Sequence, residues 1–256
     1  MKARPACRLL RRAAALLGLF ALGACSLALP GRPAVTPAAP QGGSEPADEC
    51  ANPYFPVVQG AAWTYRASGR LSGTLLRLIT AVKPDGFTDQ HSLPSGGAQT
   101  ITWECSDGIL SGQPDTGPSG LLSAGDLDAH LHATETSGVT VPDNLGPAAY
   151  WNQESTLDGV VPLQPGEAPA HVEMRTECTA GAQETVVVPA GSFSALRAEC
   201  ETHEELTVTL NGAAIPAALV TESTIWYAPG VGVVRLEQAV TNGARTTLEL
   251  VSYRIP

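Results

Sequence analysis

The sequence is short of positive charge and of aromatic residues. Its 256 residues contain 15 Lys and Arg against 25 Asp and Glu, which gives a formal net charge of −10, and aromatic side chains make up only 5%. A surface of this sign repels the phosphate backbone of nucleic acids and anionic lipid headgroups. The composition therefore argues against nucleic acid as a partner and against binding to a membrane through surface charge.

Long apolar runs are also missing. The run from Ala13 to Leu22 is too short to cross a bilayer, because a membrane-spanning helix needs about twenty apolar residues. It follows a basic stretch and precedes the small residues Gly23 and Ala24, which is the layout of a secretory signal peptide. We therefore expect residues 1–24 to be a cleaved signal.

Cys25 is the residue whose chemistry the sequence specifies best. The string Leu-Gly-Ala-Cys at residues 22–25 resembles the lipobox of bacterial lipoproteins, which implies cleavage before Cys25 and acylation of the new N-terminus. Two acyl chains or more on one residue are enough for stable anchoring. The resemblance predicts an extracytoplasmic protein held at the cell membrane or outer membrane by a lipid on Cys25. An ordinary signal peptide with a chance cysteine is the alternative.

Cleavage would leave a strongly anionic chain with two parts. Five of the 15 Lys and Arg residues and none of the 25 Asp and Glu residues precede Cys25, so the net charge would fall to about −15. Residues 25–48 are rich in Pro, Ala and Gly and show no apolar period, which predicts a disordered tether. Residues 49–256 then form a single predicted domain with enough chain for one sizeable core.

Four cysteines lie in that domain: Cys50, Cys105, Cys178 and Cys200. An even number in an oxidising compartment predicts two disulfides and allows three connectivities. A zinc site is disfavoured because no pair has the short spacing of structural zinc ligands. We favour Cys50–Cys105 with Cys178–Cys200. This choice requires the Cys178 strand to lie directly beside the Cys200 strand, since cysteines flanking a middle strand would be about 9–10 Å apart.

Alternating apolar and polar residues dominate from Trp63 onward and predict strands. Asn211-Gly212 and Asn242-Gly243 lie between such runs, and Asn-Gly readily adopts the positive φ angles of a tight hairpin. The one helical candidate after the signal is Ser123–Thr134. A weak echo between residues 56–63 and 142–151, each with a Pro, a Gly four residues on and then a Trp, is compatible with two related halves.

One polar cluster could carry chemistry. In Asp126-Leu-Asp128-Ala-His130-Leu-His132, acids and imidazoles recur at every second residue. On a strand the four side chains would share one face and form a weak candidate for a zinc or copper site. On a helix, His130 and His132 would point to different sides. We favour a solvated acidic face and predict no cofactor.

Catalytic motifs are scarce. No serine lies in a Gly-x-Ser-x-Gly elbow, and Gly230-Val-Gly232 opens no predicted helix, so it does not indicate dinucleotide binding. The acidic pairs Glu204-Glu205 and Asp126/Asp128 could serve glycosidic hydrolysis, but nothing in the sequence fixes a carboxylate separation. We therefore predict that the protein is not an enzyme and keep a hydrolase as the least favoured alternative.

The few aromatic residues gather near the starts of predicted strands: Tyr54-Phe55, Trp63, Tyr65, Tyr150-Trp151 and Trp226-Tyr227. Such side chains are typical plugs of a β core or its rim. The alternative is that some of them line an apolar cavity for a small lipophilic ligand.

Three strings, in order, resemble a group of bacterial envelope lipoproteins. They are Tyr-Phe-Pro with Gly-Ala-Ala-Trp-Thr-Tyr in residues 52–65, Val-Pro-Ala-Gly-Ser-Phe-Ser-Ala-Leu-Arg in 184–197, and Trp-Tyr-Ala-Pro-Gly-Val-Gly-Val-Val in 226–234. The group is similar to TapB-like proteins and, more remotely, to the lipoprotein-localisation factors. The resemblance implies an all-β domain in which a curved antiparallel sheet forms an incomplete barrel or sandwich.

The same resemblance implies no catalytic residues, because its glycines and prolines set turns while its large side chains fill a core. The leading hypothesis is a membrane-anchored binding or envelope-structural module that meets a protein partner or another ligand. In the localisation factors the barrel holds acyl chains. A carrier of an apolar ligand or lipid in a half-barrel is therefore the second hypothesis.

Overall fold

The computed structural model describes residues 49–114, 130–163, 166–241 and 243–256. Throughout these ranges the regular structure is β, and no helix there is long and apolar enough to span a membrane. The helix expected at 123–134 is wrong for its second half, because residues 130–138 form a strand. The predicted signal, tether and lipid site at Cys25 lie outside the described residues and stay predictions.

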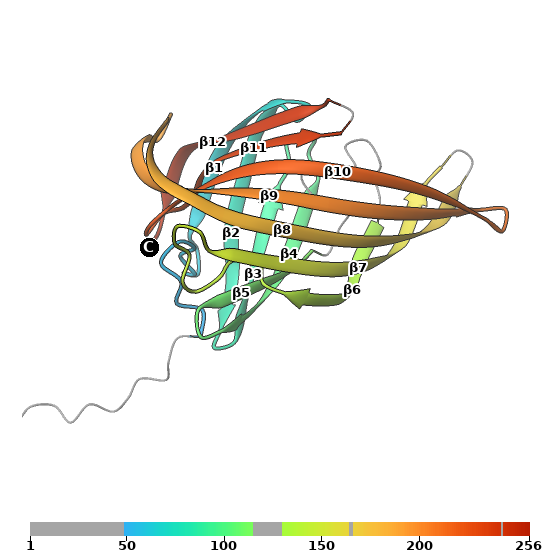
Figure 1. The fold of residues 1–256 in the computed structure, drawn as a ribbon, viewed down its shortest axis with the longest axis horizontal. Coiled ribbons are helices and arrows are strands. Elements are labelled where there is room, and N and C mark those ends of the chain that lie inside the picture. Colours follow the sequence, from blue (N-terminus) through green and yellow to red (C-terminus); the bar gives the residue numbers. More distant parts are fainter. Residues whose placement is uncertain (1–48, 115–129, 164–165, 242) are drawn as a thin grey trace, which may run out of the picture. The chain divides into compact units, whose positions relative to one another are not determined.

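The strands that the structure describes are antiparallel and follow one another along the chain (Figure 1). They are β1 (Ala62–Gly69), β2 (Gly73–Lys83), β3 (Gly86–Ser92), β4 (Ala98–Ser106), β5 (Ile109–Pro114), β6 (His130–Gly138), β7 (Tyr150–Pro162), β8 (Glu167–Val188), β9 (Gly191–Leu210), β10 (Ala213–Ala228), β11 (Gly232–Val240) and β12 (Arg245–Arg254). They form one twelve-stranded sheet in the order β5-β4-β3-β2-β1-β12-β11-β10-β9-β8-β7-β6.

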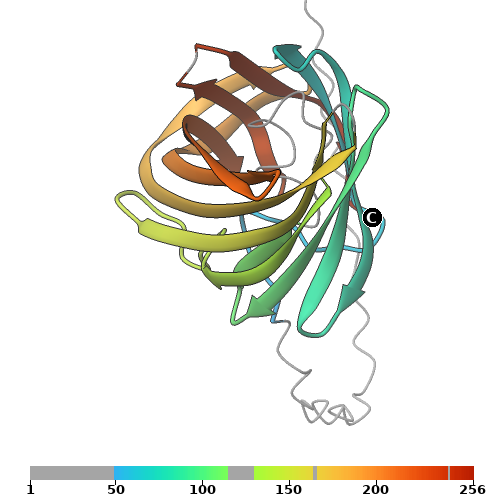
Figure 2. The same ribbon diagram turned by 90° about the vertical axis from the view of Figure 1, so that its right-hand side faces the viewer.

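This order brings the first and last strands together at the middle of the sheet and leaves β5 and β6 at its two edges. The sheet curls until these edges approach each other, so it forms a nearly closed barrel with one unsealed seam (Figure 2). The predicted all-β class and incomplete antiparallel barrel are therefore confirmed.

The seam is bridged near one end. Leu110 of β5 and Val141 exchange two backbone hydrogen bonds of 2.9 and 3.0 Å. Gln153 of β7 reaches across and donates from Nε2 to the carbonyl of Gly112 at 2.9 Å. Among the described strands, β6 pairs with β7 alone. In the described part of the chain, these contacts join the two edges at one end of the seam, and no strand pairs with the free edge of β6.

The Asn-Gly turns form as predicted where the structure describes them. Asn211 and Gly212 have φ angles of 51° and 81° and join β9 to β10. Positive φ at both central residues is what a two-residue hairpin needs to match the twist of its strands. Gly243, with φ of 86°, lies between the antiparallel β11 and β12, while Asn242 lies outside the described residues.

Apolar side chains fill two separate clusters inside the barrel. The larger one contains most of the predicted aromatic plugs, namely Phe55, Trp63, Tyr65, Trp151, Trp226 and Tyr227. The smaller one lies on the long strands and consists of Leu131, Leu157, Val161, Ala168, Ala170 and Val172. Tyr150 departs from the expectation, because it is 60% exposed. The neighbouring Trp151 takes the inward position, since successive side chains of a strand alternate between faces.

Two disulfides join the pairs that the sequence analysis favours. Cys178 of β8 and Cys200 of β9 lie directly opposite each other, with Cα atoms 4.1 Å apart. No strand separates them, because β8 is one 22-residue strand that carries both Cys178 and Val186. The pairing of β8 with β9 continues across a register irregularity between Ala180 and Gln183.

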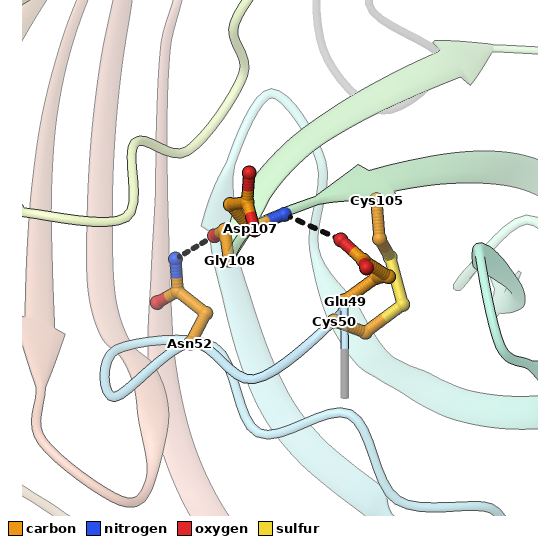
Figure 3. The surroundings of a disulfide bond; sticks show 6 residues. All are labelled: Glu49, Cys50, Asn52, Cys105, Asp107 and Gly108. Carbon is orange, nitrogen blue, oxygen red and sulfur yellow. Dashed lines mark hydrogen bonds between the residues drawn. A yellow bond between two sulfur atoms is a disulfide. The ribbon is translucent and has the colours of Figure 1, made fainter. Parts of the chain in front are cut away.

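The second disulfide, Cys50–Cys105, ties the segment that enters the barrel to β4 (Figure 3). Two hydrogen bonds reinforce it: Asn52 Nδ2 donates to the carbonyl of Gly108 at 2.8 Å, and the Asp107 amide donates to Glu49 Oε2 at 2.9 Å. The start of the domain is thereby fixed to the turn between β4 and β5.

Candidate functional site

The predicted metal cluster is only partly described. Asp126 and Asp128 lie outside the described residues, and His130 is the first residue of β6. His132 follows on the outer face of β6, opposite Asp158 of β7. Within the described ranges, no group of three or more His, Cys, Asp or Glu residues is arranged to hold a metal ion.

Asp158 instead pairs with the imidazole on its other side. His171 Nδ1 lies 2.7 Å from Asp158 Oδ1. This hydrogen bond, together with the attraction between opposite charges, holds the pKa of the Asp158 carboxyl below its ordinary value and raises the pKa of the His171 imidazole. The pair is solvent-exposed and so adds little to stability.

The outer face of β6 to β10 carries two polar hollows, of about 950 and 540 Å³, which share Glu177. We call them together the acidic groove. The charged residues along it are Glu135, Glu154, Glu173, Arg175, Glu177, Glu199, Glu201, His203, Glu205 and Glu222. A groove so rich in carboxylates fits the solvated acidic surface that the composition predicts.

Three of these carboxylates lie abreast on neighbouring strands. Glu177 of β8 is opposite Glu201 of β9, which is opposite Glu222 of β10. Like charges directly opposite each other destabilise a sheet. Arg175 lies 2.5 Å from Glu177, and His203 lies 2.6 Å from Glu201, so Glu177 and Glu201 each have a partner on their own strand.

The acidic pair considered for hydrolysis does not converge. Glu204 points into the barrel and is 4% exposed, whereas Glu205 points to the acidic groove on the outer face. Adjacent residues of a strand always diverge in this way. The two carboxylates therefore cannot flank one scissile bond.

A second polar region lies inside the barrel. Along β7 the inner face runs from Trp151 of the larger apolar cluster, past Ser155, to Leu157 of the smaller one. We call this layer the interior polar belt. Its members are the buried Arg77, Asp89, His91, Gln99, Ser155, Glu204, Thr221 and Thr246, with the partly buried Gln238. Along β7, the belt therefore lies between the two apolar clusters.

Arg77 is the centre of the belt on the β2–β3 wall. Its Nε donates to Asp89 Oδ2 at 2.7 Å, and His91 Nε2 lies 3.2 Å from the same oxygen. The guanidinium carbon lies 4.0 Å from the centre of the Phe55 ring and 4.5 Å from that of Trp63. Aromatic faces attract a cation electrostatically, more so where water is excluded.

Burial and this charge cluster shift the pKa values of its neighbours. Burial opposes ionisation of Asp89, but Arg77 and His91 more than offset it and hold the pKa of the carboxyl below its ordinary value. Burial raises the pKa of Tyr65 to about 12 despite the nearby Arg77, and it also raises the pKa of Tyr227. Asp89 is therefore ionised and both phenols are neutral at physiological pH.

Sequence reasoning missed the interior polar belt. Arg77 stands within the apolar string Leu75-Leu-Arg-Leu-Ile79, where one charge looks like an outward position. The available signal was the phase of the alternation, because Phe87, Asp89 and His91 are spaced by two and Phe87 is a core residue. That phase places both polar residues on the inner face.

Comparisons with known proteins show the fold. No family model and no curated protein matches the chain. A crystal structure described as that of a lipoprotein from Parabacteroides distasonis matches 79% of this chain and 99% of its own, with a TM-score of 0.55 and 15% identity. An exported protein with a YmcC-like fold from Bacteroides fragilis matches 80% of this chain and 100% of its own, with a TM-score of 0.48 and 16% identity. The first of these likenesses shows a shared fold.

Proposed function

We propose that this chain is a lipoprotein without enzymatic activity that presents its barrel outside the cytoplasm. The signal over residues 1–24 is cleaved, Cys25 is acylated, and the barrel serves as a binding or envelope-structural module. The observation that carries the proposal is the lipobox-like string at residues 22–25, preceded by a basic and then an apolar zone.

Two further observations support it. Disulfides persist in oxidising compartments, and the body contains two, Cys50–Cys105 and Cys178–Cys200. The Parabacteroides distasonis protein with the same fold is itself described as a lipoprotein. A flexible tether over residues 25–48 would have a root-mean-square length of roughly 27 Å, so the barrel would stay close to the membrane that holds the lipid.

A carrier of an apolar ligand ranks second. Such a carrier needs a continuous apolar lining, whereas the interior polar belt interrupts the inner face between Trp151 and Leu157. Native mass spectrometry of the purified protein would decide between the two. A retained acyl lipid in addition to the covalent anchor would favour the carrier.

Replacement of Cys25 by Ser tests the anchor. We expect the variant to lose incorporation of labelled fatty acid, and to accumulate as unprocessed precursor or as soluble protein. Cys7→Ser is the matched control, because Cys7 lies in the segment that cleavage removes, and it should be labelled and processed normally. Equal labelling and membrane fractionation of Cys25→Ser and the parent would refute the proposal.

A further inference from the structure

The segment that enters the barrel is held on the β5 side of the seam. The disulfide between Cys50 and Cys105 ties it to the end of β4, and the amide of Gly108 donates to the carbonyl of Glu49 at 2.9 Å (Figure 3). A Cβ atom added at Gly108 would lie 2.7 Å from the carbonyl oxygen of Ala51, so the two backbones are in close contact. Residues 49–52 are therefore fixed to the turn between β4 and β5.

Asn52 reaches from this segment to the other side of the seam. Its Nδ2 donates to the carbonyl of Gly108 at 2.8 Å and to the carbonyl of Pro142 at 3.0 Å. Gly108 leads into β5, whereas Pro142 follows Val141, the residue that pairs with Leu110 across the seam. One buried side chain thus donates to the backbone on both sides of the seam.

The side chain of Asn52 is also held from the following residues. Its Oδ1 accepts a hydrogen bond from the amide of Tyr54 at 2.9 Å, so the carbonyl and the amino group of the side chain both have partners. The carbonyl of Pro53 accepts from the amide of Gly230, in the turn between β10 and β11, at 2.7 Å. Contacts before and after Asn52 therefore keep its amino group against Pro142.

Apolar side chains lie directly behind this end of the seam. Leu110 and Val141 are buried and belong to the larger apolar cluster. The strand order does not pair β5 with β6. Parting of the two edges would therefore break the Leu110–Val141 bridge and the side-chain contacts across it while the twelve-stranded ladder stays intact. Local openings of this kind need less free energy than global unfolding.

We propose that residues 49–55 are a latch that controls opening of the barrel at the seam. The disulfide between Cys50 and Cys105 keeps the latch on the β5 side. The seam opens when Asn52 releases the carbonyl of Pro142 and the two edges part, with the disulfide intact. This proposal goes beyond membrane anchoring and does not depend on it, although the predicted tether would join the barrel at the latch.

The test is hydrogen–deuterium exchange of the full-length processed protein. Asn52→Ala leaves two backbone carbonyls without their donor, and we expect it to speed exchange at the amides of Leu110 and Val141 about tenfold relative to the amides of β2. Gln59→Ala is the matched control, because it removes an exposed side-chain amide that donates to the carbonyl of Thr80 at 3.4 Å. It should leave both amides at the parent's rate.

The disulfides provide a second test that does not require Asn52→Ala to fold. Cys50→Ser together with Cys105→Ser should raise exchange at the seam relative to β2, whereas Cys178→Ser together with Cys200→Ser should leave this ratio unchanged, since that disulfide joins β8 to β9 inside the sheet. Unchanged exchange at the seam in the latch variants would overturn the proposal. Equal acceleration at the seam and in β2 would do so as well, because it would mean that the segment stabilises the whole barrel and does not control the seam.

Discussion

Two ion pairs, one inside the barrel and one outside, have the same N–O distance and opposite surroundings. Arg77 Nε lies 2.7 Å from Asp89 Oδ2 inside, and Arg66 Nη2 lies 2.7 Å from Glu249 Oε2 outside. The inner side chains are 6% and 1% exposed, whereas the outer ones are 60% and 25% exposed. Distance alone therefore says little about what each pair contributes.

The difference lies in the cost of breaking the pair. Water screens the outer charges, so either one can be left alone at little cost. Inside, a charge that loses its partner stays buried without compensation. The inner pair is also held by two aromatic rings and a shared imidazole. The inner face thus specifies one arrangement, and the outer face tolerates many.

Removal of Asp89 should give the largest effect. Asp89→Ala leaves the guanidinium of Arg77 buried and unpaired, and we expect it to lower the free energy of unfolding by about 3–5 kcal/mol. The matched outer variant, Glu249→Ala, should cost less than about 1 kcal/mol. Chemical denaturation followed by tryptophan fluorescence measures both. Similar losses for the two variants would contradict the contrast between the faces.

Acid should lower the stability of the fold by protonating the Asp89 carboxyl. The pKa of Asp89 is held below its ordinary value in the folded protein, so the folded state favours the ionised form. Its stabilising contribution is fully present above the unfolded pKa of about 3.9, and it is lost as pH falls through the lower folded pKa.

Thermal unfolding of the parent and Asp89→Asn between pH 6 and pH 2 checks this effect. The variant should be less stable at pH 6 and should lose less stability on acidification. Asp158→Asn is the exposed counterpart, since the pKa of Asp158 is also lowered but by a solvent-accessible imidazole. If the parent and Asp89→Asn lost the same stability between pH 6 and pH 2, ionisation of Asp89 would not contribute to the acid sensitivity of the fold.

The features of the fold that depend on neighbouring residues could be predicted from the sequence, whereas those that depend on strand pairing could not. Alternation predicted strands over most of the domain, and Asn211-Gly212 located a hairpin, because both signals depend on neighbouring residues. The length of β8 could not be predicted, since Gly181 looks like a turn until the pairing with β9 carries the strand past it. The helix expected at 123–134 is wrong over residues 130–134 for a similar reason, because the pairing of residues 130–138 with β7 decides their conformation.

The site was less predictable than the fold. The preferred cysteine pairs rested on an even number of cysteines and on the requirement that the Cys178 strand lie directly beside the Cys200 strand. The pairing of β8 with β9 meets this requirement. The interior polar belt depends on long-range closure of the sheet. Closure places Arg77 and Thr246 on the inside of one barrel, although they are 169 residues apart in the sequence. Local patterns can indicate which face of a strand a residue occupies, but they do not show which distant residues share the interior with it.

The smallest effect is expected on the outer face, and it has the opposite sign. Glu222→Gln removes one of three carboxylates that lie abreast, so we expect it to stabilise the fold by about 0.2–1 kcal/mol. The gain should shrink in high salt, because added ions already screen exposed charges. Denaturation at low and at high salt measures it, with Thr224→Val on the same face as the uncharged control. A loss of stability in Glu222→Gln would mean that this carboxylate has a partner on the surface, and that the outer face is as specific as the inner one.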